Sequence, residues 1–221
     1  MQIALLGGTG DIGQGLALRW ARDTNHDIII GSREAEKAET KADEYETELA
    51  SRDVDVDIAG LANPEAAAEA DVIVLSVPAY YLSDTIDDVA DEIGDAVLVS
   101  PAVGMQRDES GVHYNPPGVG SVTALAAKAA PDDVPIVGAF HNLAAGKLAN
   151  LDADLDWDVP LVSDDEDAKD TVTALAEGID GIRALDAGDL ANASEVESMT
   201  PLLINLAANN EGMHDLGVKF W

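Results

Sequence analysis

Hydrophobic residues open the chain as a short run and then alternate with segments that have helical spacing. Met1 to Leu6 is predicted to form a buried strand, and Ile12, Leu16 and Trp20 follow at intervals of four residues, as on one face of a helix. A second apolar run, Ile28-Ile29-Ile30, predicts another strand. The chain therefore starts with a strand, helix, strand unit.

The same alternation continues for more than a hundred residues. Further strands are predicted at Val54 to Ile58, Asp71 to Pro78, Ala96 to Ser100 and Pro135 to Phe140. Helices are predicted at Glu34 to Arg52, from Asn63 and Pro64 to Glu69, at Tyr81 to Ile93 and at Ser121 to Ala130. Strands and helices in regular alternation predict an α/β fold with a doubly wound, mostly parallel sheet of the Rossmann class.

The last third of the chain has a different pattern. A short strand from Val159, a helix from about Asp167, a strand at Ile182 to Leu185 and a long apolar helix at Glu195 to Asn209 are expected. We place a boundary near residue 155, with a Rossmann domain at 1–155 and a small C-terminal α/β subdomain at 156–221. The helical spacing of Met199, Leu202, Leu203 and Leu206 predicts core packing or a subunit interface, and hence a homodimer.

A glycine turn joins the first strand to the first helix. We expect Gly8 to permit the tight turn, Gly10 to let the backbone approach a pyrophosphate, and Gly13 to let the helix pack closely on the strand. The free N–H groups of that helix then face the phosphates. Because the turn follows an apolar strand and opens a helix, it predicts a dinucleotide site.

The end of the second predicted strand indicates which dinucleotide binds. An NAD site usually carries Asp or Glu there, whereas this chain has Ser32 and Arg33, with Lys37 one turn later. A hydroxyl, a guanidinium and an ammonium group bind a 2′-phosphate, which a carboxylate would repel. The sequence therefore predicts a preference for NADP.

Composition narrows the remaining possibilities. The 221 residues include 43 Asp plus Glu against 12 Lys plus Arg, a formal net charge of −31, yet 47% of residues are hydrophobic. The acids are spread along the chain, so we expect a folded halophilic protein whose self-repulsion is screened in concentrated salt. Few cations argue against binding to nucleic acid or to an anionic membrane. The absence of a signal peptide or a spanning apolar run predicts a cytoplasmic protein.

Candidate chemistry other than cofactor binding is sparse. The chain has no cysteine, no Gly-x-Ser-x-Gly elbow, and no pair of histidines at metal-ligand spacing, so we expect no metal site. His141 is the only histidine at the end of a predicted strand, with Asn142 to Gly146 after it. A structural role for His141 and a role in proton transfer both stay open.

The motifs together resemble those of the NADPH-dependent coenzyme F420 reductases along nearly the whole chain. The matching stretches are Ala4 to Gly10, Gly31-Ser32-Arg33 with Lys37, Ala149-Asn150-Leu151, Asp156 to Pro160, Leu185 to Gly188 and Leu216 to Phe220. The resemblance implies reversible, direct hydride transfer between NADP(H) and coenzyme F420, an 8-hydroxy-5-deazaflavin. Such a step needs no protein nucleophile, so ring positioning carries the rate.

The resemblance also implies roles for individual residues. Thr9, Gly10, Asp11 and Ile12 would contact the pyrophosphate, and Ser32, Arg33 and Lys37 the 2′-phosphate. The adenosine, the nicotinamide and the stacked rings would be contacted by Val77, Ala79, Ser83, Val103 and Ala145, with His141 and Leu216 as ring-positioning candidates. The chain departs from the family at Ala79, where a large aromatic residue is common, and at Ala144, near which proline is common.

Two other hypotheses remain at this point. The NADP site could serve the reduction of a different small acceptor, such as an imine, a keto acid or a ferric chelate. Alternatively, the protein could be a non-catalytic NADP-sensing module that binds a protein partner.

Overall fold

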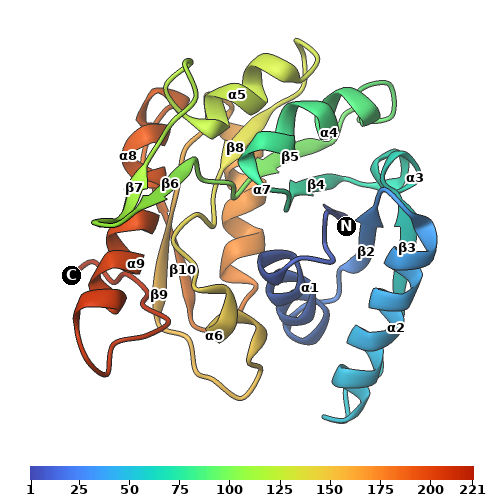
Figure 1. The fold of residues 1–221 in the computed structure, drawn as a ribbon. Coiled ribbons are helices and arrows are strands. Elements are labelled where there is room, and N and C mark those ends of the chain that lie inside the picture. The colour runs from blue at the N-terminus through green and yellow to red at the C-terminus, as the bar shows by residue number, and fades with distance from the viewer.

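A parallel sheet of six strands forms the centre of the computed structural model, which describes all residues from 1 to 221 (Figure 1). The strand order is β3-β2-β1-β4-β5-β8, and every pairing in it is parallel. The bounds are β1 (Gln2–Leu6), β2 (Asp27–Ser32), β3 (Ile58–Ala62), β4 (Val72–Leu75), β5 (Val97–Ser100) and β8 (Ile136–Gly138). The order reverses between β1 and β4, where such sheets bind ligands. The predicted Rossmann-type α/β fold is confirmed.

Helices cover both faces of the sheet. Residues with alternating parity on each strand point to opposite sides, so Ile3 and Leu5 join one core of 33 buried residues while Ala4 and Leu6 join another of 18. The first core lies under α1 (Asp11–Asp23), α2 (Ala35–Ala50) and α7 (Glu166–Glu177), and the second under α3 (Asn63–Glu69), α4 (Leu82–Val89) and α5 (Val122–Ala129). Burial on both faces explains why the strands are continuous apolar runs.

The C-terminal third adds a second, smaller sheet. Strands β9 (Trp157–Leu161) and β10 (Ile182–Asp186) pair in parallel, and an antiparallel bridge from Gly138 to Val162 joins this pair to the edge of the main sheet. Side chains from β9 and α7 belong to the same core as those of β1 and β2. Residues on the two sides of position 155 therefore share one core.

Two predicted elements differ from the structure. The third strand is Ile58–Ala62 instead of Val54 to Ile58, because Val54 and Val56 pack against the core in the segment that leads into the strand. The long C-terminal helix is interrupted at Ser198, which separates α8 (Ala193–Glu197) from α9 (Met199–Asn209). Pro201 has no N–H group to donate to the carbonyl four residues earlier, and this explains the interruption.

A β-hairpin was not predicted from the sequence. It consists of β6 (Met105–Asp108) and β7 (Gly111–Tyr114), and all of β6 is exposed, so no apolar alternation marks it. The Asn205 side chain of α9 holds the hairpin, because it accepts a hydrogen bond from the N–H of Val112 (2.9 Å) and donates one to its carbonyl (2.6 Å). The remaining short elements are η1 (Ala79–Tyr81), α6 (Ala145–Ala149) and η2 (Leu190–Asn192). None of the helices is both long enough and apolar enough to cross a lipid bilayer.

Candidate active site

The turn between β1 and α1, with the first turn of the helix, contains four glycines. Backbone conformation or close packing within the protein requires glycine at three of these positions, but not at the fourth, Gly10. Gly7 has φ +76° and is the left-handed residue of the turn, a role that the sequence analysis did not assign to it. A Cβ at Gly8 would lie 2.8 Å from the Leu5 carbonyl oxygen, and one at Gly13 would lie 2.6 Å from Gly8 Cα. A Cβ at Gly10 would meet no atom closer than 3.5 Å. The space above Gly10 is therefore open for a ligand.

The N-terminus of α1 offers free backbone donors beside this turn. The first helical hydrogen bond runs from the Gln14 N–H to the Gly10 carbonyl (2.8 Å), and no side chain caps the helix. The N–H groups of Asp11 and Ile12 are therefore left for an anion. Because the Ile12 side chain packs against the core, it can contribute only its backbone.

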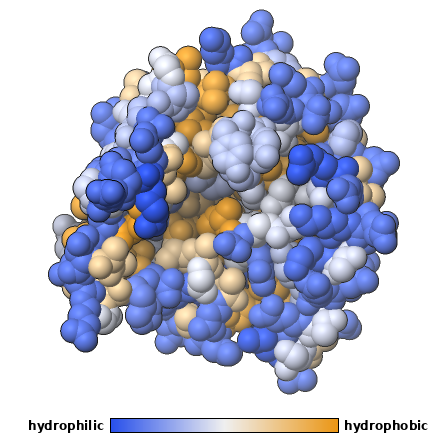
Figure 2. Space-filling model, viewed as in Figure 1, coloured by the Kyte–Doolittle hydropathy of each residue, from blue (hydrophilic) through white to orange (hydrophobic).

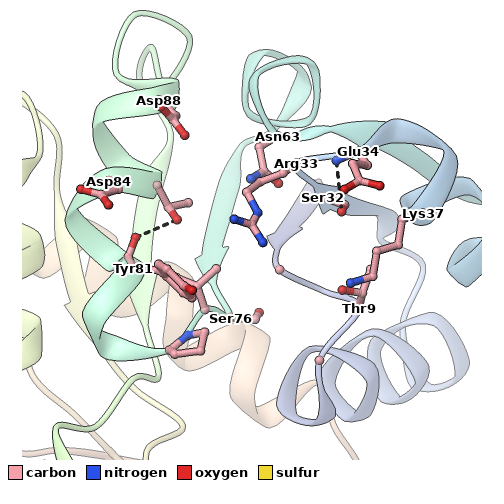
Figure 3. Close-up of a pocket in the computed structure, with 15 residues that line it drawn as sticks. Thr9, Ser32, Arg33, Glu34, Lys37, Asn63, Ser76, Tyr81, Asp84 and Asp88 are labelled. Carbon is pink, nitrogen blue, oxygen red and sulfur yellow. Dashed lines mark hydrogen bonds between the residues drawn. The ribbon is translucent and has the colours of Figure 1, made fainter.

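A cavity of about 520 Å³ extends from this turn along the C-terminal ends of the strands, a volume typical of ligand sites (Figure 3). Six of the predicted residues line it: Thr9, Gly10, Ser32, Arg33, Lys37 and Val77. The sequence analysis did not assign a site role to these other lining residues: Glu34, Asn63, Ser76, Pro78, Tyr81, Asp84, Thr85 and Asp88. Their position in the sequence could have identified them as candidates, since most of them follow the ends of β2, β3 and β4.

Two cations in this cavity have no carboxylate partner. Neither Arg33 nor Lys37 takes part in any ion pair of the structure, although the chain carries 43 carboxylates. Arg33 instead extends into the cleft toward Tyr81, and Lys37 points from α2 toward Thr9 (Figure 3). The guanidinium carbon of Arg33 lies 5.6 Å from the centroid of the Tyr81 ring, within the range of a cation–π contact.

Two buried polar atoms in the wall of the cavity also lack partners. Asn63 is 5% exposed and Ser76 is 8% exposed, and neither the Asn63 Oδ1 nor the Ser76 Oγ forms a hydrogen bond within the protein. Buried polar groups normally have partners, so these atoms fit a ligand that carries hydroxyl or phosphoryl groups. Together with the open space at Gly10, they show that the residues present fit a dinucleotide.

A second cavity, of about 270 Å³, lies between α6 and α9 and is mainly apolar. Its lining includes the predicted residues Ala145 and Leu216, together with Asn142, Leu143, Ala144, Thr200, Leu203, Ile204, Ala207 and Asp215. Figure 2 shows a hydrophilic surface over most of this face of the molecule, with hydrophobic residues gathered in a hollow at its middle. Such a surface suits a flat ring system that has to be shielded from water.

The backbone is strained beside the second cavity. Phe140, at the end of β8, has φ +66°, and Asp215, which lines the cavity, has φ +49°. A bulky residue in the left-handed region is uncommon, and such residues concentrate at functional sites. The strain supports a functional role for this part of the chain.

The C-terminal tail holds Leu216 in the second cavity through the buried carboxylate of Asp158. Asp158 accepts two hydrogen bonds from Arg183 (2.9 and 2.6 Å) and one from the N–H of Phe220 (2.7 Å). Its own N–H donates to the Val218 carbonyl (2.7 Å). The hydrogen bonds that the carboxylate accepts, from Arg183 above all and from Phe220 and Lys219, hold the pKa of Asp158 down to about 2. The contact explains why the stretches Asp156 to Pro160 and Leu216 to Phe220 occur together.

The structure places His141 in the protein interior. Its side chain is 3% exposed and lines neither cavity, the Nε2 lies 3.4 Å from the Thr123 Oγ1, and the Nδ1 has no partner. Burial lowers the pKa of His141 to about 3, so the imidazole is neutral at ordinary pH. The neighbouring Asn142 lines the second cavity.

Five further predicted residues are absent from the lining of both cavities: Asp11 and Ile12, whose N–H groups lie beside the glycine turn, and Ala79, Ser83 and Val103. Ala79 packs against the core beneath α3, α4 and α5, while Ser83 and Val103 are half-buried. Both cavities are lined by residues that follow the C-terminal ends of strands in the main sheet: β2, β3 and β4 for the polar cavity, and β8 for the apolar one. The arrangement can bind a dinucleotide in the polar cavity and a flat apolar ring beside it.

Comparison with known proteins decides which family has this arrangement. Residues 2–104 match the family model described as NADP oxidoreductase, coenzyme F420-dependent. The chain is 42% identical to the F420-dependent NADP reductase of Methanothermobacter thermautotrophicus, over 99% of this chain and 94% of that protein. It is equally identical to the F420-dependent NADP reductase of Methanocaldococcus jannaschii, over 93% of this chain and 92% of that protein.

The chain belongs to the F420-dependent NADP reductase family. The resemblance seen in the sequence is thereby confirmed. A crystal structure of a putative F420-dependent NADP reductase from Arthrobacter has the same fold, with a TM-score of 0.82 at 21% identity and coverage of 100% of this chain and 99% of that one.

Proposed function

We propose that this F420-dependent NADP reductase transfers a hydride directly, and in either direction, between NADP(H) and coenzyme F420. The observation that carries the proposal is the pair of unpaired cations, Arg33 and Lys37, beside a glycine turn that leaves room for a pyrophosphate. The two substrates supply the chemistry. In F420 reduction a hydride leaves the nicotinamide ring of NADPH and the deazaflavin takes it up together with a solvent proton, whereas the reverse reaction returns the hydride to NADP+ and releases the proton.

The polar cavity would hold NADP by its phosphates. The N–H groups of Asp11 and Ile12 and the open face of Gly10 would receive the pyrophosphate. Arg33 and Lys37 would bind the 2′-phosphate together with Ser32, whose hydroxyl already accepts a long hydrogen bond (3.4 Å) from the Glu34 N–H. The unpartnered Asn63 Oδ1 would accept a hydrogen bond from a sugar hydroxyl, and the Ser76 Oγ would donate to or accept from one.

The apolar cavity would hold the deazaflavin ring against the nicotinamide. Ala145 at the start of α6 offers its backbone N–H to the carboxamide, and Leu216 closes the opposite side. No side chain near this cavity has the geometry of a nucleophile with its base, and the neutral His141 is not poised for proton transfer at neutral pH. The protein therefore contributes ring positioning and exclusion of water.

An assay with both substrates tests the function. NADPH oxidation by the purified protein should require coenzyme F420 and should be accompanied by a loss of absorbance at 420 nm as the deazaflavin is reduced. Turnover with an imine, a keto acid or a ferric chelate, but not with coenzyme F420, would favour the other acceptors. Tight NADP binding without turnover would favour a sensing module.

The residues that line the two cavities also indicate which part of the chain binds which substrate. We propose that residues 1–155 bind NADP and that residues 156–221 complete the deazaflavin pocket, because Leu216 and α9 line only the apolar cavity.

Leu202 is 57% exposed and Leu206 is 40% exposed on α9, which supports a homodimer that covers this face. Light scattering should give the mass of a dimer for the native protein and of a monomer for Leu202→Glu. A monomeric native protein at micromolar concentration would contradict the homodimer.

The charge of the protein suggests the solvent in which it works. With a net charge of −31 and 11 salt-bridge contacts in the structure, most carboxylates face water without a cation. We propose adaptation to concentrated salt, where the screening length falls to about 3 Å at 1 M. Activity and stability that rise together with salt would support it. The cytoplasmic location stays a prediction.

A further inference from the structure

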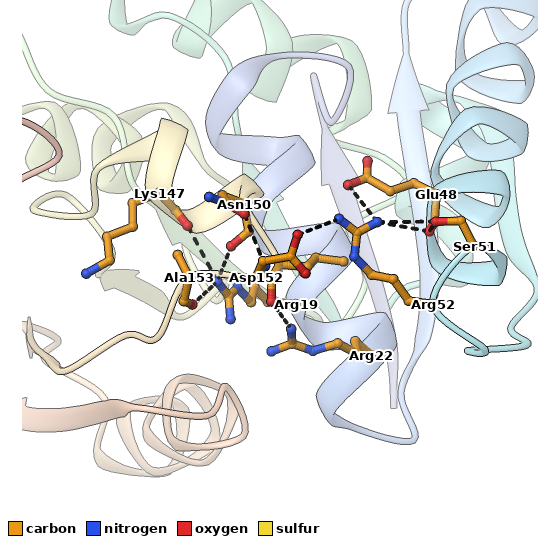
Figure 4. Close-up of polar contacts among 10 residues, drawn as sticks. Arg19, Arg22, Glu48, Ser51, Arg52, Lys147, Asn150, Asp152 and Ala153 are labelled. Atoms are coloured by element: carbon orange, nitrogen blue, oxygen red, sulfur yellow. Dashed lines mark hydrogen bonds and ion pairs between the residues drawn. The ribbon is translucent and has the colours of Figure 1, made fainter.

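Arg19, on α1, is a buried arginine whose hydrogen-bond partners are all backbone carbonyls (Figure 4). The residue is only 2% exposed. Its Nε donates to the Leu148 carbonyl (3.0 Å), and its Nη2 donates to the carbonyls of Asn150 (2.7 Å), Ala153 (2.9 Å) and, at 3.5 Å, Lys147. One guanidinium therefore holds four carbonyls that lie more than a hundred residues away along the chain.

Burying the Arg19 cation against carbonyls, with no carboxylate beside it, costs free energy. Burial lowers the pKa of Arg19, with the nearby Arg22 acting in the same direction, so the environment opposes the charge. A chain with 43 carboxylates nevertheless places none of them in contact with this cation. The carbonyls of Lys147 and Leu148 belong to the last turn of α6, which has no helical donors for them, and Arg19 supplies those donors.

Two of the four bonds join the rear of α1 to the last turn of α6, and the other two hold the residues just after it; the front ends of both helices face the two cavities. The front of α1 is the glycine turn of the polar cavity, whereas Ala144 and Ala145 at the front of α6 line the apolar cavity. The helices also touch closely, because a Cβ at Gly15 would lie 2.8 Å from the Leu148 Cγ. A shift of α6 along α1 would therefore change the distance between the two cavities.

The loop that follows α6 is held by two more arginines, but from its exposed side. Arg22 donates to the Leu151 carbonyl (2.7 Å), and Arg52, just after α2, pairs with Asp152 (3.4 Å) (Figure 4). Neither of these residues contacts a carbonyl of α6 itself. Arg19 is thus the only arginine of the three that fixes the helix, and Arg22 is a matched control on the same helix.

We propose that Arg19 is a positioning residue that sets the nicotinamide side of the site, Ala144 and Ala145, at a fixed distance from the glycine turn. The proposal rests on the proposed function, because it assigns the polar cavity to the adenosine half of NADP and α6 to the nicotinamide half. Arg19 itself touches neither half.

Binding of 2′,5′-ADP and of NADP to Arg19→Met separates this role from a general structural one. The first ligand lacks the nicotinamide half, so its Kd should stay within twofold of the native value. The Kd for NADP should rise about tenfold, as expected for one lost hydrogen bond to a charged group, and F420-dependent kcat should fall at least as much. For Arg19→Lys, the Kd for NADP and kcat should lie between those of the native protein and those of Arg19→Met. Arg22→Met should match the native protein in all three measurements.

Equal weakening of both ligands in Arg19→Met, or no change in either, would overturn the proposal. If Arg19→Met does not fold by circular dichroism, the same comparison is made with Arg19→Lys, which keeps the charge but not the fork of donors. Unchanged NADP affinity and kcat in that variant would also overturn it. Failure of the proposed function has a separate signature in the native protein, which would then either bind neither 2′,5′-ADP nor NADP or bind NADP without F420-dependent turnover.

Discussion

Arg33 stands over the face of Tyr81, with 5.6 Å between its guanidinium carbon and the centroid of the ring. The two residues come from opposite walls of the polar cavity, one after β2 and the other at the end of η1. The contact holds an exposed side chain where a 2′-phosphate can meet it, so part of the ordering cost is met before the cofactor binds.

Replacing Tyr81 should weaken NADP binding without removing a phosphate ligand. A cation–π contact at an exposed site contributes about 0.5 to 1 kcal/mol, so Tyr81→Leu should raise the Kd for NADP about two- to fivefold. Tyr81→Phe keeps the ring face and should bind like the native protein. Calorimetric titration of the three proteins checks this, and equal affinity of the Leu and native proteins would refute the role of the ring.

Asp84 and Asp88 of α4 line the same cavity as Arg33 and should oppose an anionic cofactor. In the lowest salt at which the protein stays folded, Asp88→Asn should tighten NADP binding about two- to fivefold, from about 0.5 to 1 kcal/mol of repulsion between exposed charges. Screening at about 1 M salt should remove most of the difference. Asp132→Asn, at the other edge of the sheet before β8, is the control and should have no effect on Kd.

The C-terminal tail should matter for one substrate only. Deleting Gly212 to Trp221 removes Leu216 from the apolar cavity and should abolish F420 turnover while NADP still binds with native affinity. Retention of F420 turnover in the truncated protein would show that the tail does not close the pocket.

Asp158→Asn should lower the free energy of unfolding by about 1 to 3 kcal/mol, because it weakens the bonds to Arg183 and Phe220.

His141 should make stability depend on pH in mildly acidic solution. Its pKa is about 3 in the folded protein and near 6.5 when unfolded, so the unfolded chain binds more protons between these values. Its contribution is complete above about pH 6.5 and is lost as the pH falls toward 3, with a slope of up to about 1.4 kcal/mol per unit. The depressed pKa of Asp158, about 2, acts only below its ordinary value of 3.8.

Urea unfolding between pH 4.5 and 7 therefore isolates the histidine. The native protein should lose stability faster than His141→Gln as the pH falls through this window, because glutamine does not titrate. Parallel curves for the two proteins would mean that the imidazole is not buried in its neutral form.

The parts of the fold that could be predicted are those whose signal lies within a few residues. Strands β1, β2 and β4 are buried on both faces and are therefore continuous apolar runs, and Arg33 could be assigned because it directly follows one of them. The exposed hairpin β6 to β7 and the edge strand β3 have no such pattern. Their positions depend on tertiary contacts such as that between Asn205 and Val112.

Contacts between distant segments explain most of what the sequence did not reveal about the site. Arg19 meets its carbonyls 128 to 134 residues further along the chain, and Tyr81 meets Arg33 across the cleft. The position of His141 after β8 made it a candidate, but only the packing of Thr123 and its neighbours shows that the ring is buried.

The most direct test of the account is the ratio of kcat/KM for NADPH to kcat/KM for NADH in F420 reduction, measured for the native protein and for Arg33→Ala. Loss of a charge-assisted bond of roughly 1.5 to 3 kcal/mol should reduce this ratio by about one to two decades, whereas Arg107→Ala on the exposed hairpin should leave it unchanged. Equal use of NADPH and NADH by the native protein, or an unchanged ratio in Arg33→Ala, would contradict it.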